Sequence, residues 1–310
     1  TGNPHPDREK PMTSSDTAPK IGIYIDLWDK RSDGSRSTWA DIREMAIKSE
    51  QQGFDSIWVP DRLMMGEVGV WESTTMLAAI AAVTSKVTLG TAVLRSIYRN
   101  PTLLAKIVES IEEISGGRLL LGLGAGSNEG DNQMFGYPES YPYSRFEEAF
   151  EIVRTLLREG QVDFNGRFYQ ANETVLRPRG PRGNGPPIMI AALGPRMMRL
   201  AALHADYWNT HIVPNTPEEW VPTLEDLDRA CEEVGRDPAT LKRLAGVLVN
   251  TRKGVEHVYG DSVSGEPEAI ADRLREFYAA GFEELILWPA VDNAASVDEL
   301  MPVLEHLQDR

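Results

Sequence analysis

The sequence has a single cysteine, Cys231, among its 310 residues. One cysteine cannot form an internal disulfide or supply a cysteine-rich metal cluster, so we expect Cys231 to be a small half-buried residue of a helix. Long apolar runs are missing as well. None approaches the roughly 18 residues of a membrane-spanning helix, and the start of the chain has no apolar signal region. These absences predict a cytoplasmic protein with no membrane partner.

Positive charge is also scarce in this chain. Lys and Arg total 32 against 47 for Asp and Glu, which gives a formal net charge of −15. Such a balance argues against a protein that binds nucleic acid or an anionic membrane. It also means that an anionic ligand would have to be held by locally placed arginines.

Histidine is rare, and its spacing matches no metal-binding pattern. We therefore predict no metal site. A nucleophile-elbow signature for serine catalysis is missing too. Of the five histidines, only His211 follows a predicted strand, and it is therefore the one placed for chemistry in a pocket.

The chain divides into a short arm and one domain. Residues 1–19 contain four prolines and no apolar periodicity, so we predict a flexible N-terminal arm there. From residue 20 to residue 310 no shift in composition marks a second domain. We predict a single domain over this range.

Short β-rich apolar runs alternate with longer amphipathic runs from Lys20 onward. Strands separated by helices run parallel with right-handed crossovers, and eight of them can close. We predict an α/β fold, a (β/α)8 TIM barrel with insertion segments at the C-terminal face of the strands. An open doubly wound sheet is the alternative, because periodicity does not show closure. A hairpin is expected over 161–175, turning at Asn165-Gly166. The predicted strands are 21–26, 54–59, 87–94, 118–123, 188–192, 205–209, 242–250 and 282–288.

Residues that follow the strands carry the chemistry of such a barrel. Here they are rich in aromatics, glycine and arginine, a set that suits a flat ring with an anionic tail. The run Gly122-Leu-Gly-Ala-Gly126 does not open a helix at once, so it fails the context of a dinucleotide loop. Instead, it suits close approach of the backbone to a ligand ring. Gly194-Pro195 precedes a predicted helix, and with Arg196 it forms a candidate anion site.

Several stretches together resemble the bacterial luciferase-like flavin oxidoreductases. The resemblance covers about residues 20–290 and implies a barrel that binds FMN or the 8-hydroxy-5-deazaflavin coenzyme F420. The sequence looks most similar to the deazaflavin-dependent branch. The matching stretches include Gly53-Phe-Asp-Ser-Ile-Trp-Val-Pro-Asp61, Val87-Thr-Leu-Gly-Thr-Ala-Val-Leu94, Gly117-Arg-Leu-Leu-Leu-Gly-Leu-Gly-Ala-Gly126, Pro187-Ile-Met-Ile-Ala-Ala192 and Ala205-Asp-Tyr-Trp-Asn209.

The resemblance also implies roles for individual residues. It places a non-proline cis peptide at Ala92-Val93, beneath the central ring. Asp61 matches a position that contacts the ring or its ribityl chain. The loop beside the ring corresponds to Ala125, Gly126 and Ser127, and the loop for the tail phosphate corresponds to Ala191, Ala192, Leu193 and Gly194.

Two departures from the deazaflavin branch concern acid–base chemistry. Relatives often carry histidine where this chain has Arg62, and some dehydrogenases carry a proton-donating glutamate where it has Ser127. Arg62 would stay protonated and could orient an anionic substrate, but it is a poor general base. A sugar-phosphate dehydrogenase is thereby disfavoured.

The resulting function prediction is hydride transfer between coenzyme F420 and a small or medium organic substrate. One alternative is an FMN-dependent monooxygenase that uses oxygen and reduced flavin from a partner reductase. The other is a non-catalytic flavin-binding protein. A homodimer or higher homo-oligomer is expected from the resemblance. The candidate catalytic residues are Asp61, Arg62, Ser127 and His211; Arg95 and Arg196 join the cofactor residues; Trp28, Arg62 and Trp288 form the substrate side.

Because both candidate cofactors are anionic, the sequence predicts a locally positive mouth on a negative body. The arginines expected there are Arg62, Arg95, Arg99, Arg177, Arg179, Arg182, Arg196 and Arg199.

Overall fold

The computed structural model describes residues 19–31, 34–126, 129–210, 216 and 219–308. Nearly all of the predicted N-terminal arm lies outside these residues. No helix among them is both long enough and apolar enough to cross a membrane.

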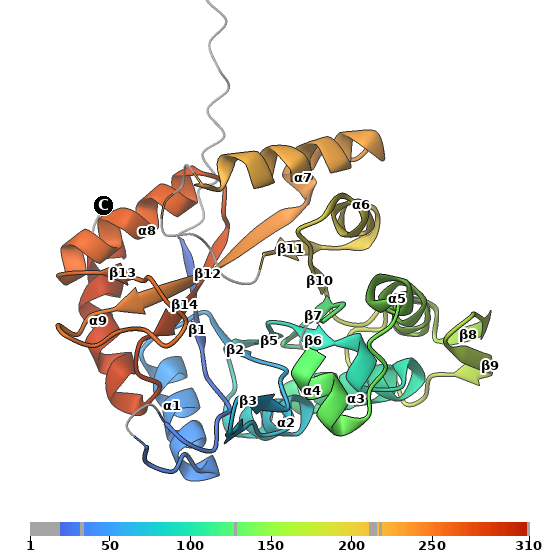
Figure 1. The fold of residues 1–310 in the computed structure, drawn as a ribbon, viewed down its shortest axis with the longest axis horizontal. Helices are drawn as coiled ribbons and strands as arrows, with labels where there is room; N and C mark the ends of the chain where they lie inside the picture. The colour runs from blue at the N-terminus through green and yellow to red at the C-terminus, as the bar shows by residue number, and fades with distance from the viewer. Residues whose placement is uncertain (1–18, 32–33, 127–128, 211–215, 217–218, 309–310) are drawn as a thin grey trace, which may run out of the picture.

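Eight parallel strands form the centre of the molecule (Figure 1). Neighbouring strands pair around the whole ring, and pairing of Ile188 with Leu121 and of Lys20 with Glu284 leaves no open edge. The predicted barrel is therefore confirmed, and the open doubly wound sheet is wrong. The strands are β1 (Lys20–Tyr24), β2 (Ser56–Val59), β5 (Thr88–Thr91), β7 (Leu119–Gly124), β10 (Ile188–Ala191), β11 (Tyr207–Asn209), β12 (Lys242–Asn250) and β14 (Glu284–Pro289).

Helices surround the barrel and follow the predicted pattern (Figure 1). The helix after β5 shows why: Asn100 accepts a 3.0 Å hydrogen bond from the Thr102 amide, Pro101 fixes the first turn, and Gly116 ends the helix at φ 65°. The helices are α1 (Trp39–Gln51), α2 (Ser73–Val83), α3 (Pro101–Ser115), α4 (Glu129–Phe135), α5 (Pro142–Glu159), α6 (Pro195–His204), α7 (Val221–Glu233), α8 (Pro267–Ala279) and α9 (Ala294–Gln308).

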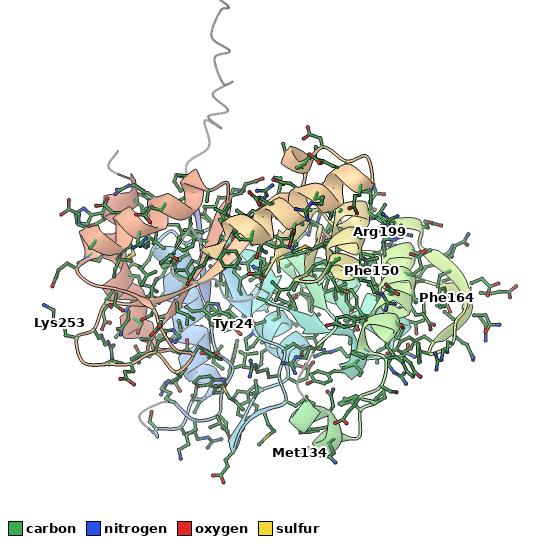
Figure 2. The ribbon with its side chains drawn as sticks, turned by 45° about the horizontal axis from the view of Figure 1, so that its top comes forward. Tyr24, Met134, Phe150, Phe164, Arg199 and Lys253 are labelled. Carbon is green, nitrogen blue, oxygen red and sulfur yellow. The ribbon has the colours of Figure 1, made fainter. Side chains whose placement is uncertain are left out.

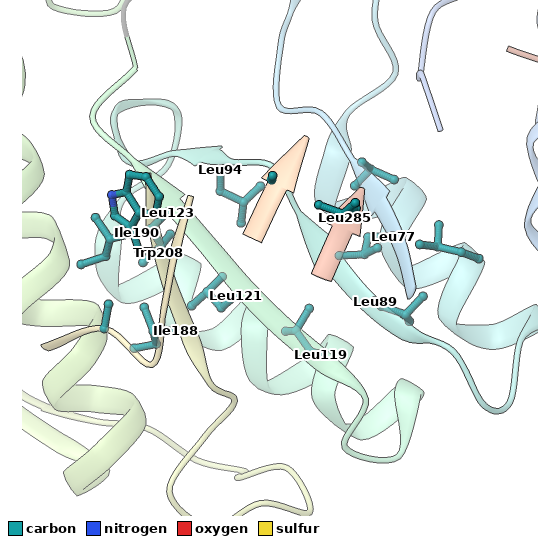
Figure 3. Close-up of a cluster of buried hydrophobic side chains, with 14 of the residues drawn as sticks. Leu77, Leu89, Leu94, Leu119, Leu121, Leu123, Ile188, Ile190, Trp208 and Leu285 are labelled. Atoms are coloured by element: carbon teal, nitrogen blue, oxygen red, sulfur yellow. The ribbon is translucent and has the colours of Figure 1, made fainter. Parts of the chain in front are cut away.

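Two apolar layers form the core. The larger layer lies between the strands and the helices (Figure 3). The smaller fills the barrel interior, where Trp58 is fully buried. A Cβ on Gly90 would lie 2.2 Å from the Trp58 ring, so glycine there makes room for the indole. The Trp58 Nε1 donates to Ser56 (2.6 Å) and to the buried carboxylate of Glu284 (3.2 Å), which closes the floor of the barrel.

The predicted hairpin is present as β8 (Gln161–Asn165) and β9 (Gln170–Val175). Its loop spans residues 166–169 rather than turning at Asn165-Gly166. The Glu148 carboxylate holds this wider loop, because it accepts hydrogen bonds from the Arg167, Phe168 and Tyr169 amides at 2.9, 2.8 and 3.1 Å. The hairpin joins the end of α5 to β10, so it lies at the amino ends of the strands.

Candidate functional site

A pocket of about 380 Å³ opens at the carboxyl ends of the strands. Its size lies in the range typical of small-molecule sites. It brings together the segments after four strands, β2, β5, β7 and β10, to which the sequence assigned cofactor contacts. The predicted residues that line it are Asp61, Arg62, Ala92, Val93, Arg95, Ala125, Gly126, Ala191, Ala192, Leu193 and Gly194.

One wall of the pocket is built from the segment after β5. The Ala92-Val93 peptide bond is cis, as the resemblance implied. A Cβ on Gly124 would lie 2.7 Å from the Val93 side chain, and one on Gly122 would lie 1.8 Å from the Thr91 carbonyl oxygen. These glycines were expected to let a ligand approach the backbone. Their first role is instead to let β7 pack against this wall.

Asp61 holds the same wall in place. Both of its carboxylate oxygens accept from the Arg99 guanidinium at 2.8 and 2.9 Å, and one accepts from the Arg95 amide at 2.7 Å. The Ser73 hydroxyl lies 2.9 Å from the other oxygen. Because both oxygens are already held by donors of the wall, the geometry of Asp61 favours a positioning role over the predicted catalytic one.

Arg95 and Arg62 provide the positive charge at the pocket. The Arg95 guanidinium donates to the Tyr98 hydroxyl at 2.8 Å, and neither arginine forms an ion pair with a carboxylate among the described residues. Gly126, at φ 73°, leaves space for the Arg95 chain. Arg99 does not line the pocket, and its guanidinium pairs with Asp61 and Glu72.

The prediction that the arginines of the loop before β10 contribute to a locally positive mouth is wrong. Arg179 pairs with Glu109 at 2.7 Å, and Arg182 pairs with Glu112 and the Leu119 carbonyl. Leu119 is the first residue of β7, so this loop lies at the amino ends of the strands. A segment that enters a strand must lie there, which is the physical reason for the correction. Arg177 belongs to the same loop.

Arg196 is also misplaced in the sequence prediction. Its guanidinium binds Glu147 on α5 at 2.7 Å and the Ser144 hydroxyl at 3.0 Å, and the side chain is 53% exposed. It does not line the pocket, and neither does the exposed Arg199 (Figure 2). The loop from Ala191 to Gly194 does line it, directly before α6, and anion binding at the N-terminus of that helix stays a prediction.

The predicted substrate side is only partly in the pocket. Trp288 is 2% exposed and packs against Tyr24 with ring centroids 3.6 Å apart and the ring planes tilted by 34°, so it supports the floor. Trp28 lines a small adjoining cavity instead of the main pocket. Ser127 and His211 lie outside the described residues, and their predicted roles stay predictions.

Tyr24, the last residue of β1, and Asp26, two residues beyond it, were not assigned a role from the sequence. Tyr24 lines the main pocket, and Asp26 lines the adjoining cavity together with Asp292. Tyr24 lies within β1, so it is not among the residues that follow the strands. The period of two along a strand could have found it, because Gly22, Tyr24 and Asp26 share the face that points into the barrel.

The carboxyl groups of Asp26 and Asp292 lie in an environment that favours their protonated forms. Burial raises the pKa of Asp26 to about 7, against a hydrogen bond from Tyr259 and the charge of Arg62, which lower it. Burial and the neighbouring Asp26 raise the pKa of Asp292 well above its usual value. Two buried carboxyl groups this close favour sharing one proton.

Comparison with known proteins agrees with this geometry. A family model described as luciferase-like monooxygenase matches residues 21–259. This chain belongs to the luciferase-like monooxygenase family.

The chain is similar to two reductases. The phthiodiolone/phenolphthiodiolone dimycocerosates ketoreductase of Mycobacterium sp. (strain JLS) is 34% identical over 220 residues, which cover 64% of this chain and 57% of that protein. The 5,10-methylenetetrahydromethanopterin reductase of Archaeoglobus fulgidus is 30% identical over 232 residues, which cover 73% of this chain and 67% of that protein. The match to the first of these relatives spans less than two thirds of its length.

A solved structure has the same fold. It is an F420-dependent secondary alcohol dehydrogenase in complex with an F420-acetone adduct, with a TM-score of 0.81 at 18% sequence identity. The alignment covers 94% of this chain and 100% of that chain.

The pocket of this luciferase-like protein fits a flavin or deazaflavin. The cis peptide and the Gly124–Gly126 loop form adjoining walls, and the loop before α6 presents a helix N-terminus to an anionic tail. Arg95 and Arg62 have no carboxylate partner among the described residues, so their charges are available to a ligand. Among these residues there is no cluster of three side chains that could hold a metal.

Proposed function

We propose that this protein is an oxidoreductase that transfers hydride between coenzyme F420 and a carbonyl or alcohol group of an organic substrate. The observation that carries the proposal is the meeting of the Ala92-Val93 cis peptide, the loop before α6 and Arg95 in one pocket. The names of the related ketoreductase and of the structurally similar alcohol dehydrogenase support this choice of reaction.

Different residues of the pocket would contact the coenzyme and the substrate. When bound, coenzyme F420 supplies or accepts the hydride. Arg95 and the amides before α6 would hold its anionic tail, while Ala92 and Val93 support its ring. Arg62 lies at the pocket without an ion pair to any carboxylate of the described residues and would orient the oxygen of the substrate.

A binding titration followed by a turnover assay tests the proposal. Purified protein is titrated with coenzyme F420 and with FMN, each oxidised and reduced, and the fluorescence is recorded. We expect micromolar binding of coenzyme F420, and consumption of its reduced form in the absence of oxygen when small ketones are added. Binding of FMN alone, or turnover only with oxygen, would establish the monooxygenase instead. Binding without turnover across a broad panel of substrates would indicate a non-catalytic protein.

A further inference from the structure

Tyr24 places a phenol inside the pocket. Its side chain is 2% exposed, lines the pocket and packs on Trp288. Figure 2 labels it near the centre of the barrel. Its hydroxyl group has no hydrogen-bond partner among the described residues, although a buried phenol normally has one. A substrate oxygen in the pocket would satisfy it.

Asp26 lies one strand period beyond Tyr24, on the same inward-facing side of the chain. It is 8% exposed, and the Tyr259 hydroxyl donates to its Oδ1 at 3.3 Å. Asp292 lines the same small cavity, and its Oδ1 is buried without a hydrogen-bond partner. Tyr24 and Arg62, which line the main pocket, both interact electrostatically with Asp26 in this cavity.

We propose that Tyr24 is the proton donor to the substrate oxygen and that the Asp26–Asp292 pair replaces its proton. The proposal rests on the proposed function. In the reduction of a ketone, the carbonyl carbon gains a hydride, and the C=O double bond becomes a single bond. The oxygen takes the phenolic proton of Tyr24, and the phenolate regains a proton from the carboxyl pair. The ketone is reduced and the coenzyme is oxidised.

Other groups at the pocket are less suited to this role. Asp61 accepts from Arg99 and from the Arg95 amide, so its oxygens are occupied. A guanidinium such as that of Arg62 does not release its proton near neutral pH. Burial raises the pKa of Tyr24 well above its usual value, so the phenol stays protonated and available as a donor.

The charged and titratable groups around Asp26 decide its proton affinity. Arg62 and the Tyr259 hydrogen bond favour the carboxylate, whereas burial and Asp292 favour the acid. Tyr24 faces the pair from β1, Arg31 faces Asp292, and His257 packs against Tyr259 with ring centroids 5.8 Å apart. The opposing effects leave Asp26 with a pKa of about 7, at which it can both give and take a proton.

The first test needs no coenzyme. Trp28 lines the cavity of Asp26, and Trp288 packs against Tyr24, so tryptophan fluorescence reports on the carboxyl pair. We expect the fluorescence of the coenzyme-free protein to change with a midpoint near pH 7. The change should disappear in Asp26→Asn and persist in Asp261→Asn, which alters an exposed carboxylate. A wild-type titration without this transition, or one that Asp26→Asn leaves intact, overturns the role of the pair.

The second test separates proton donation from packing. Tyr24→Phe keeps the ring against Trp288 and removes the hydroxyl. We expect the melting temperature and coenzyme affinity to stay as in the wild type while kcat for ketone reduction falls about 10²- to 10⁴-fold. Asp26→Asn should lose the pH dependence of kcat near 7. Unchanged kcat in Tyr24→Phe overturns the donor role.

The outcomes distinguish this inference from the proposed function. If the wild type binds neither coenzyme, the proposed function fails, and the fluorescence titration still decides whether Asp26 and Asp292 share a proton. If the wild type reduces ketones and Tyr24→Phe does so equally well, the function holds and the inference fails.

Discussion

The guanidinium of Arg99 donates two hydrogen bonds, of 2.8 and 2.9 Å, to the two carboxylate oxygens of Asp61. The Asp61 side chain is 1% exposed and that of Arg99 is 9% exposed, so the pair is shielded from water. Since Asp61 also accepts from the Arg95 amide, this ion pair fixes the chain directly after the cis peptide.

Removing the charge of Asp61 should therefore lower the stability of the protein and loosen the pocket wall. Asp61→Asn leaves the buried Arg99 with only the partly exposed Glu72 as an ion-pair partner among the described residues, and we expect the free energy of unfolding to fall by about 1.5–3 kcal/mol in urea titrations. Asp226→Asn breaks the exposed pair with Arg229 and should cost about 0–1 kcal/mol. A variant of Asp61 as stable as the wild type would contradict the positioning role.

Arg95 and Arg196 should differ in their effect on coenzyme binding. Arg95 lines the pocket without a carboxylate partner among the described residues, whereas Arg196 binds Glu147 outside it. Arg95→Ala should weaken coenzyme binding by roughly 1.5–3 kcal/mol, about ten- to a hundredfold in Kd. Arg196→Ala serves as the matched control and should leave Kd unchanged. Equal losses in calorimetric titrations of the two variants would show that Arg196 reaches the ligand.

Gly90 should tolerate no side chain. A Cβ would lie 2.2 Å from the fully buried Trp58 ring, which hydrogen bonds to Ser56 and Glu284 hold in place. We expect Gly90→Ala to lower the free energy of unfolding by about 1–3 kcal/mol. Gly183→Ala is the control, since nothing lies within 4 Å of a Cβ there. Thermal melts of both variants check this, and an unshifted melt for Gly90→Ala would refute it.

The stability of the protein should depend on the ionisation of Asp26. Its pKa is about 7 in the folded protein and returns toward 3.8 on unfolding. Between these values the folded state binds a proton that the unfolded state has released, so stability falls as pH rises across this window. Asp26→Asn should remove much of this pH dependence, which amounts to a change on the order of a few kcal/mol in the free energy of unfolding across the window. Urea unfolding from pH 4 to 8 measures it; identical slopes in wild type and variant would be inconsistent with a buried acid.

The fold could be predicted from the sequence because strand and helix periods alternate without interruption. Helix-end signals such as Asn100-Pro101 and Gly116 also coincide with the observed boundaries. The width of the hairpin loop could not be predicted, since it depends on the distant carboxylate of Glu148. Local sequence patterns therefore predict where helices and strands lie, whereas the width of this hairpin loop depends on a contact with a helix.

The candidate site was predictable only in part. Segments that follow strands, such as Ala92-Val93 and Ala191–Gly194, do meet in one pocket. Arg182 could have been excluded, because it precedes β10 and so belongs to the opposite end of the barrel. Arg196 could not, since only the folded chain brings Glu147 to it. The raised pKa of Asp26 likewise depends on burial beside Asp292, which lies far away in the sequence.

The packed floor of the barrel restricts how a ligand can enter and leave the pocket. Trp58 and Trp288 fill the described interior below Ala92, so a molecule leaves by the opening through which it came. When two ligands share such a blind-ended space, the one lying deeper must arrive first and depart last. The architecture thus favours an ordered sequence of binding and release over a random one.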